Sequence, residues 1–143
     1  MPRGTLEVIL VSAKGLAHID FLSKTDPYVI LTYRTQQHRS SVAKGSDPLW
    51  NESFLFTVSD SESELNLRIM DKDTFTDDDF VGEAIIFLEP VFVNGSVPET
   101  AYVVVKDEKY SGEIKVALTF TPERGRGIDE EEEEISKLRP WKE

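Results

Sequence analysis

The chain contains no cysteine, and it lacks any apolar run near the roughly 20 residues that a membrane-spanning helix needs. The missing cysteines exclude disulfide scaffolds, thiol nucleophiles and zinc–thiolate sites, and they fit a reducing compartment, so we expect the cytoplasm. Residues 1–15 have neither a long apolar stretch nor a small-residue cleavage site, and Pro2 stands where N-myristoylation requires glycine. We therefore expect no targeting segment and no covalent lipid anchor.

Positive charge is scarce as well. Lys and Arg number 16 against 27 Asp and Glu, which gives a formal net charge of −11. As a whole, such a chain repels nucleic-acid backbones and anionic lipid headgroups, so any affinity for either must be local or switched. Nucleic-acid binding is further disfavoured because the sequence has no basic stripe and no aromatic stacking surface.

The motifs of common catalytic sites are missing too. The chain has only two histidines, no G-x-S-x-G nucleophile elbow and no glycine-rich phosphate loop. Paired acids could still serve general acid and base chemistry, so spacing alone leaves a carboxylate-only hydrolase open. We expect a protein that is not an enzyme.

What the sequence does contain is a series of short strand patterns. At 143 residues the chain has the size of one globular domain. Eight segments with alternating or continuous apolar residues are separated by turn residues, and none has a ten-residue helical period: 5–13, 28–33, 37–43, 54–58, 65–70, 81–88, 101–105 and 113–120. Eight antiparallel strands in about 120 residues favour an all-β sandwich.

The end of the chain has a different composition. Gly125 and Gly127 precede an acidic block, and residues 129–143 hold seven acids and three bases, a net charge of −4. Segments with much charge and few apolar residues tend to stay disordered. We expect a folded domain over residues 1–121 and a disordered acidic tail over residues 122–143, with a short partner motif around Lys137 to Lys142 as the alternative.

Aspartates gather at two places far apart in the sequence. After the first and the fifth expected strands come Asp20, Asp26, Asp71, Asp73 and Asp79. Side chains alternate along an extended strand, so the carboxylates of Asp71 and Asp73 point to one side and Lys72 points away. Like charges about 4 Å apart repel by roughly 4 kcal/mol at an effective dielectric of about 20. A cation would be needed to hold such a group together.

Calcium suits these donors better than magnesium. Calcium takes 6 to 8 oxygen ligands in loose geometry, so five aspartates with nearby carbonyls suffice for two ions, whereas magnesium keeps its waters and wants a strict octahedron. An EF-hand starting at Asp71 fails, because Thr76 stands where the motif needs Gly and Gly82 where it needs Glu. The alternative interpretation is a set of ordinary turn aspartates in solvated loops.

Three blocks of sequence, in order, resemble the C2 domain family over residues 4–121. They are Ile19-Asp20 with Thr25-Asp26-Pro27-Tyr28-Val29, then Pro48-Leu49-Trp50-Asn51-Glu52-Ser53-Phe54, then Asp71-Lys72-Asp73 with Asp79-Phe80-Val81-Gly82. The resemblance implies an eight-stranded antiparallel β-sandwich that binds calcium through the five aspartates. It also implies further ligands in the Ile19 and Lys72 carbonyls and the Thr76 hydroxyl, with the carboxylates of Asp77 and Asp78 adding to that set or competing with it.

A closer resemblance concerns the order of the strands and the size of the chain. The first strand leads straight into the first acidic segment and the last expected strand is 113–120, which is similar to the circularly permuted type II topology. The small size and stretches 71–75 and 112–116 look like the small plant single-C2 proteins of the elicitor-responsive and 16 kDa phloem protein types. That resemblance implies a role in plant defence or stress signalling.

Apolar residues lie inside the acidic segments. Phe21, Leu22 and Phe75 are flanked by charge, and exposed apolar tips beside a cation site indicate insertion into a lipid interface. Burying one such side chain contributes about 1.5 to 3 kcal/mol, whereas micromolar binding needs about 8 kcal/mol. Calcium would supply the remainder by removing carboxylate repulsion and by offering open coordination positions to lipid oxygens. The alternative is packing between loops.

A sparse basic stretch surrounds the third expected strand and contains Arg34, Arg39 and Lys44. Many C2 domains bind phosphoinositides through a lysine-rich face here, whereas a solvated edge strand with protective charge is the other interpretation. The sequence thus predicts a cytoplasmic monomer that moves to anionic phospholipids of the plasma membrane when calcium rises. The alternatives are a phloem-mobile RNA or protein trafficking factor and a calcium-independent protein-interaction adaptor.

Overall fold

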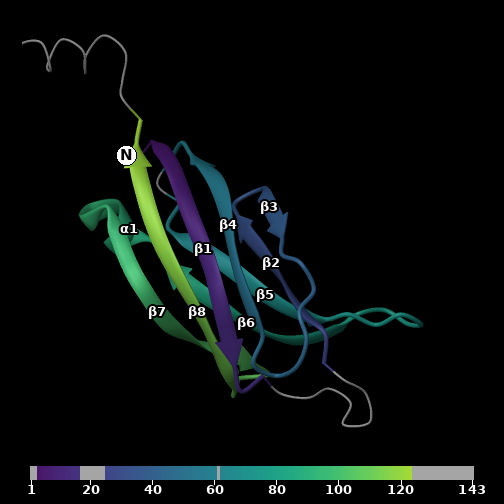
Figure 1. Ribbon diagram of the computed structural model, residues 1–143. Helices are drawn as coiled ribbons and strands as arrows, with labels where there is room; N and C mark the ends of the chain where they lie inside the picture. The colour runs from purple at the N-terminus through teal and green to yellow at the C-terminus, as the bar shows by residue number, and fades with distance from the viewer. Residues whose placement is uncertain (1–2, 17–24, 61, 124–143) are drawn as a thin grey trace, which may run out of the picture.

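The computed structural model describes residues 3–16, 25–60 and 62–123 of the chain. Those residues form eight strands and one short helix (Figure 1). The elements are β1 (Gly4–Lys14), β2 (Pro27–Tyr33), β3 (Gln36–Arg39), β4 (Leu49–Val58), β5 (Glu64–Asp71), β6 (Asp79–Phe87), α1 (Glu89–Asn94), β7 (Ser96–Lys106) and β8 (Lys109–Pro122). Each pairing between neighbouring strands is antiparallel, so the predicted all-β fold is confirmed.

The strands form a sandwich of two four-stranded halves. Their order is β3-β2-β5-β6-β7-β8-β1-β4, and a single residue pair, Glu83 with Val105, joins β6 to β7. The sheet therefore turns back on itself at this junction, and β3 and β4 become its two edges. The halves pack face to face, as the ring of Tyr33 in β2 meets the edge of the Phe56 ring in β4 at a centroid distance of 6.2 Å.

The core follows from the period of two along each strand. In β1 every second side chain, Leu6, Val8 and Leu10, is fully buried, and in β2 the same holds for Val29 and Leu31. Each such side chain contributes about 1.5 to 3 kcal/mol by leaving water. A one-residue slip of register would turn the whole set outward, so the pattern fixes the pairing of the strands and with it the position of the loops.

Three strand boundaries differ from those expected. β3 ends at Arg39, while β4 begins at Leu49 and β7 begins at Ser96, both earlier than local pattern suggests. In β7 the register shifts between Val97 and Thr100, so the intervening Pro98 lies in an irregular part of the ladder, where the missing N–H of proline is tolerated. Tertiary pairing therefore overrides the turn residues.

Helix α1 spans only six residues and was not expected from the sequence. Pro90 occupies its first turn, and Gly95 ends it in the left-handed region at φ 90°. The Gly95 amide donates to the Val91 carbonyl at 2.8 Å, and Val91 is the buried residue of the helix. A helix this short has too few turns to produce a periodic pattern, although Asn94-Gly95 marks its end as a turn.

The two ends of the sandwich carry different parts of the chain. At one end β1 stops, β2 and β6 begin, and β5 ends, and the connection between β5 and β6 reaches outward to the right of Figure 1. At the other end Gly4 pairs with Pro122, and the Glu123 amide donates to the Arg3 carbonyl at 2.7 Å. Among the described residues no helix has the length and apolar character to cross a membrane.

Candidate functional site

Strand register brings aspartates from both acidic segments to one end of the sandwich. Asp71 pairs with Pro27 across β2 and β5, and it pairs with Asp79 across β5 and β6. The Asp26 amide donates to Asp71 Oδ1 at 2.8 Å, and the Lys72 amide returns a bond to the Asp26 carbonyl at 2.9 Å. Two segments 45 residues apart in sequence are thus joined by backbone as well as by side chain.

Asp71 is the most buried of these carboxylates, with 6% of its surface exposed. Burial is the largest cause that raises its pKa, and the Asp26 amide acts in the opposite direction. The carboxylates of Asp26, Asp79 and Asp73 raise the pKa further by repulsion. A carboxylate enclosed with like charges is costly, and a cation beside it would relieve that cost.

Asp26 carries the clearest sign of an unfilled interaction. Its Oδ1 atom is buried and has no hydrogen-bond partner. The nearest cation is the Lys44 ammonium, whose Nζ lies 3.8 Å away on a side chain that is 87% exposed. Buried carboxylate oxygens are normally satisfied, so this atom is open to a hard cation, which accepts oxygen ligands in loose geometry.

Asp73 lies two residues beyond the end of β5, so it does not continue the strand with Asp71 as expected. Its Oδ1 accepts hydrogen bonds from the Phe75 amide at 2.9 Å and the Thr76 amide at 3.3 Å, and these bonds lower the pKa of Asp73. The turn that they close leaves the Phe75 side chain 93% exposed. The Thr76 hydroxyl donates to the Asp77 carbonyl at 3.3 Å.

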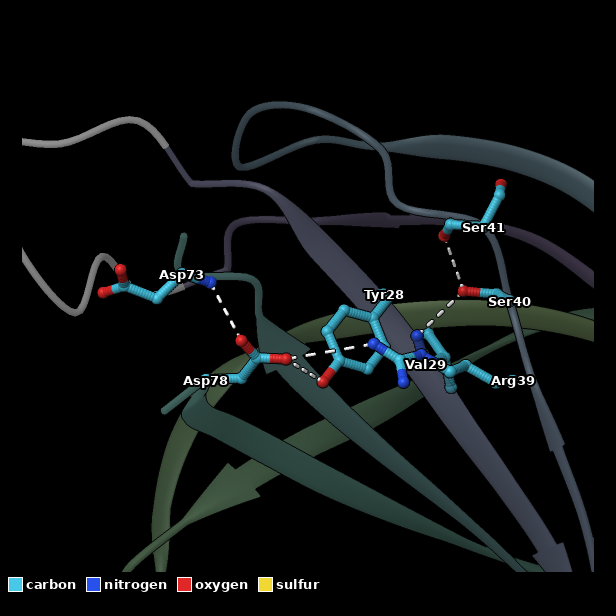
Figure 2. Close-up of polar contacts among 7 residues, drawn as sticks. All are labelled: Tyr28, Val29, Arg39, Ser40, Ser41, Asp73 and Asp78. Atoms are coloured by element: carbon cyan, nitrogen blue, oxygen red, sulfur yellow. Dashed lines mark hydrogen bonds and ion pairs between the residues drawn. The ribbon is translucent and has the colours of Figure 1, made fainter. Parts of the chain in front are cut away.

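Asp78 occupies a position that the sequence left open. Its Oδ1 accepts the Asp73 amide at 2.9 Å, and its Oδ2 accepts a short hydrogen bond from the Tyr28 hydroxyl (Figure 2). The Arg39 guanidinium lies 4.1 Å over the Tyr28 ring, with one nitrogen 3.9 Å from Asp78 Oδ2. The Tyr28 hydroxyl and the Asp73 amide hold the pKa of Asp78 below its ordinary range.

The basic residues of the predicted lipid face each lie beside an aspartate. Arg34 forms an ion pair with Asp60, Arg39 approaches Asp78, and Lys44 approaches Asp26. Arg39 belongs to β3, which is an edge strand. Trp50, which we assigned to packing, is buried and donates from its indole nitrogen to the Ser41 carbonyl at 2.9 Å.

The donors at this end have the chemistry that a calcium ion requires, because all are oxygens and one is an orphaned buried atom. Within residues 3–16, 25–60 and 62–123, however, no three acidic, histidine or cysteine side chains are arranged to hold a metal ion. Four of the predicted ligands and contacts lie outside the described residues: Ile19, Asp20, Phe21 and Leu22.

Comparison with known proteins agrees with the strand order and the acidic loops. The C2 domain model matches residues 4–109, and the chain belongs to the C2 domain family. It is 63% identical over 135 residues to 16 kDa phloem protein 2 of Arabidopsis thaliana, with 92% of each chain covered. It is 57% identical over 136 residues to elicitor-responsive protein 3 of Oryza sativa subsp. japonica, covering 92% of this chain and 94% of the relative. The predicted resemblance to single-C2 plant proteins is confirmed, and neither relative is named as an enzyme.

Solved structures show the same architecture. A C2 domain-containing protein is 61% identical with a TM-score of 0.76, and the match covers 88% of this chain and 95% of that chain. The two calcium-bound C2 domains of Extended-Synaptotagmin 2 give 28% identity and a TM-score of 0.73, covering 85% of this chain and 47% of theirs.

Proposed function

We propose that the protein is a calcium-dependent phospholipid-binding module that moves from the cytosol to the plasma membrane when calcium rises. The observation that carries the proposal is the buried, unpartnered Oδ1 of Asp26 next to the buried Asp71 carboxylate. Both atoms belong to a folded framework that holds like charges together. The calcium-bound Extended-Synaptotagmin 2 domains share this fold, which makes calcium the first cation to test.

The proposed ligand set remains the one drawn from the sequence. Asp26, Asp71, Asp73 and Asp79 come from the described end of the sandwich, and Asp20 would complete the carboxylates for two ions. The Lys72 and Ile19 carbonyls, the Thr76 hydroxyl and Asp77 are the further candidates. Bound calcium would neutralise the carboxylates and offer open positions to phosphate or carboxylate oxygens of anionic lipids.

The membrane contact is proposed for the apolar tips of the same loops. The exposed Phe75 ring stands at the turn held by Asp73, and Phe21 and Leu22 are the corresponding candidates in the other acidic segment. Insertion of apolar side chains adds binding energy only after repulsion between the acidic loops and the anionic surface is removed. Calcium sensing and lipid insertion would therefore act at one place on the molecule.

Liposome co-sedimentation tests this proposal. Wild type and the double variant Asp71→Asn/Asp73→Asn are mixed with phosphatidylserine vesicles in calcium and in chelator. Wild type is expected to pellet only with calcium, and the double variant in neither condition. The matched control Glu64→Gln/Glu99→Gln loses the same charge from exposed positions and is expected to behave as wild type.

The outcomes against the proposal are distinct. Equal pelleting of wild type in calcium and in chelator would refute the calcium switch and favour an adaptor that works without calcium. Retention of RNA at physiological salt without calcium would favour a trafficking role. Sedimentation equilibrium of the calcium-free protein tests the proposed monomer.

A further inference from the structure

The carboxylate of Asp78 joins the β5–β6 loop to strand β2. One oxygen accepts the Asp73 amide at 2.9 Å, and the other accepts the Tyr28 hydroxyl (Figure 2). Residues 28 and 78 are 50 positions apart in the sequence, so this is a tertiary connection and not part of the local turn. Both oxygens of the side chain are thereby engaged within the protein.

The Tyr28 end of this connection is fixed. Tyr28 lies in β2, is 3% exposed and pairs with Met70 of β5. The Arg39 guanidinium covers its ring at 4.1 Å and approaches Asp78 Oδ2 at 3.9 Å. A cation over an aromatic face adds to the stability of this arrangement. The hydroxyl is thus presented to the loop from a position that the strand pairing determines.

The loop end depends on the connection much more. Residues 74–77 are exposed, and the two amide bonds to Asp73 Oδ1 are internal to the turn. These internal bonds shape the turn but do not fix its position relative to β2. The Asp78 carboxylate supplies that link, because it contacts both the strand and the Asp73 backbone.

We propose that Asp78 is a positioning residue that holds Asp73 and the Phe75 tip in place for calcium and lipid, and that it is not itself a calcium ligand. The inference rests on the proposed function and assigns a different role to one member of the acidic loop. A ligand loop that is held in its binding conformation does not pay an ordering cost when calcium arrives. If the competent conformer fell to about a tenth of the population, the apparent calcium affinity would fall about tenfold.

A single hydroxyl separates the two roles of Asp78. Tyr28→Phe keeps the buried ring and removes only the bond to Asp78 Oδ2. If Asp78 positions the loop, the variant binds calcium about three- to tenfold more weakly. If Asp78 is a ligand, removing its partner frees an oxygen, and the affinity is unchanged or higher. Tyr110→Phe is the matched control, since it removes an exposed hydroxyl elsewhere and is expected to leave the affinity unchanged.

Isothermal titration with calcium chloride on wild type, Tyr28→Phe, Asp78→Ala and the double variant measures these affinities. Residues that act as one unit give non-additive effects. The double variant is therefore expected to be no weaker than Asp78→Ala alone. Additive losses, or a Tyr28→Phe affinity equal to or above that of wild type, would overturn the proposal.

A second measurement needs no calcium. Amide hydrogen exchange of Asp73 is followed by NMR in chelator, where the proposal expects exchange at least about threefold faster in Tyr28→Phe and Asp78→Ala than in wild type. Unchanged exchange in both variants would refute the positioning role even if wild type binds calcium. Faster exchange in a protein that binds no calcium would support the structural link and refute the proposed function alone. Thermal unfolding of each variant verifies that the fold is retained.

Discussion

The side chain of Gln36 pairs with the backbone of Thr57 as another strand would. Gln36 Nε2 donates to the Thr57 carbonyl at 2.6 Å, and the Thr57 amide donates to Gln36 Oε1 at 2.8 Å. Gln36 belongs to β3 and Thr57 to β4, which are the two edges of the sheet. Two residues further along β3, His38 Nε2 bonds the Leu55 carbonyl at 2.8 Å, so its ring nitrogen is the donor. Side chains thus connect the two edges where no ladder runs between them.

Removing this amide should loosen the two halves. A hydrogen bond contributes about 0.5 to 1.5 kcal/mol net, so Gln36→Ala is expected to lower the free energy of unfolding by about 1 to 3 kcal/mol. Urea denaturation measures the change. Gln37→Ala is the control, because Gln37 bonds only the Thr32 side chain of its neighbouring strand, at 3.3 Å, and should cost less than about 0.5 kcal/mol. Equal effects of the two substitutions would contradict the bridging role.

The Asp71 carboxylate should make stability depend on pH in an unusual direction. Its pKa is raised above the ordinary 3.8, so the folded protein holds a proton there more readily than the unfolded chain. The stability that this group contributes is present below pH 3.8 and is lost as the pH rises through the raised pKa. In chelator at about pH 7, Asp71→Asn is therefore expected to be more stable than wild type, and the difference should shrink toward about pH 3.

Calcium should reverse that order. A ligand that binds only the folded state at about a hundred times its Kd stabilises it by about 2.7 kcal/mol per site, and Asp71→Asn should gain much less. Denaturation curves at neutral pH with calcium and with chelator measure both effects, and Glu64→Gln should follow wild type throughout. A wild-type curve that does not move in millimolar calcium would refute calcium binding.

Phe75 should matter for lipid binding and not for folding. Its side chain is already exposed, so Phe75→Ala should change the free energy of unfolding by less than about 0.5 kcal/mol. If the ring enters the lipid interface, its loss should weaken calcium-dependent vesicle binding by about tenfold, which corresponds to partial burial of an apolar side chain. Fluorescence titration with vesicles measures the affinity.

Phe87 provides the matched control for that experiment. It is 65% exposed and lies at the end of β6, away from the Asp79 end where the acidic loop joins the strand. Phe87→Ala removes the same ring from the opposite end of the sandwich and should leave vesicle binding unchanged. If both alanine variants lose affinity equally, the Phe75 tip is not the membrane contact.

Truncation tests the proposal that residues 1–121 are the folded domain and residues 122–143 an acidic tail. The last described contact of the chain is the bond from the Glu123 amide to the Arg3 carbonyl. A chain that ends at Glu123 is therefore expected to unfold at the same temperature as the full chain and to bind vesicles in calcium with the same affinity. A loss of either property would show that the tail belongs to the domain or to the site.

The strand count and the acidic loops could be predicted because both depend on local patterns. Alternation in residues 5–13 and 28–33 gives β1 and β2, and the spacing of Asp71, Asp73 and Asp79 marks the end of β5 and the start of β6. What sequence could not provide is pairing between distant residues. The role of Asp78 depends on the Tyr28 hydroxyl, and the start of β7 depends on a ladder that tolerates Pro98.

The Asp71 and Asp73 pair shows a further limit. An extended backbone would direct both carboxylates the same way, but β5 ends at Asp71 and the Asp73 side chain instead closes a turn with the Phe75 and Thr76 amides. Aspartate competes locally for backbone donors, which a strand pattern does not represent. The unpartnered oxygen of Asp26 likewise became visible only with the neighbours in place.

The pairing of Gly4 with Pro122 has a practical consequence for experiments in living cells. Because the described chain enters and leaves at the same corner, remote from the acidic loops, a fluorescent reporter could be joined at either side without standing between those loops and a bilayer. The two natural ends could also be linked by a few residues and new ends opened elsewhere, since adjacent termini favour circular permutation. Imaging of such fusions would follow recruitment directly, with the working surface left bare.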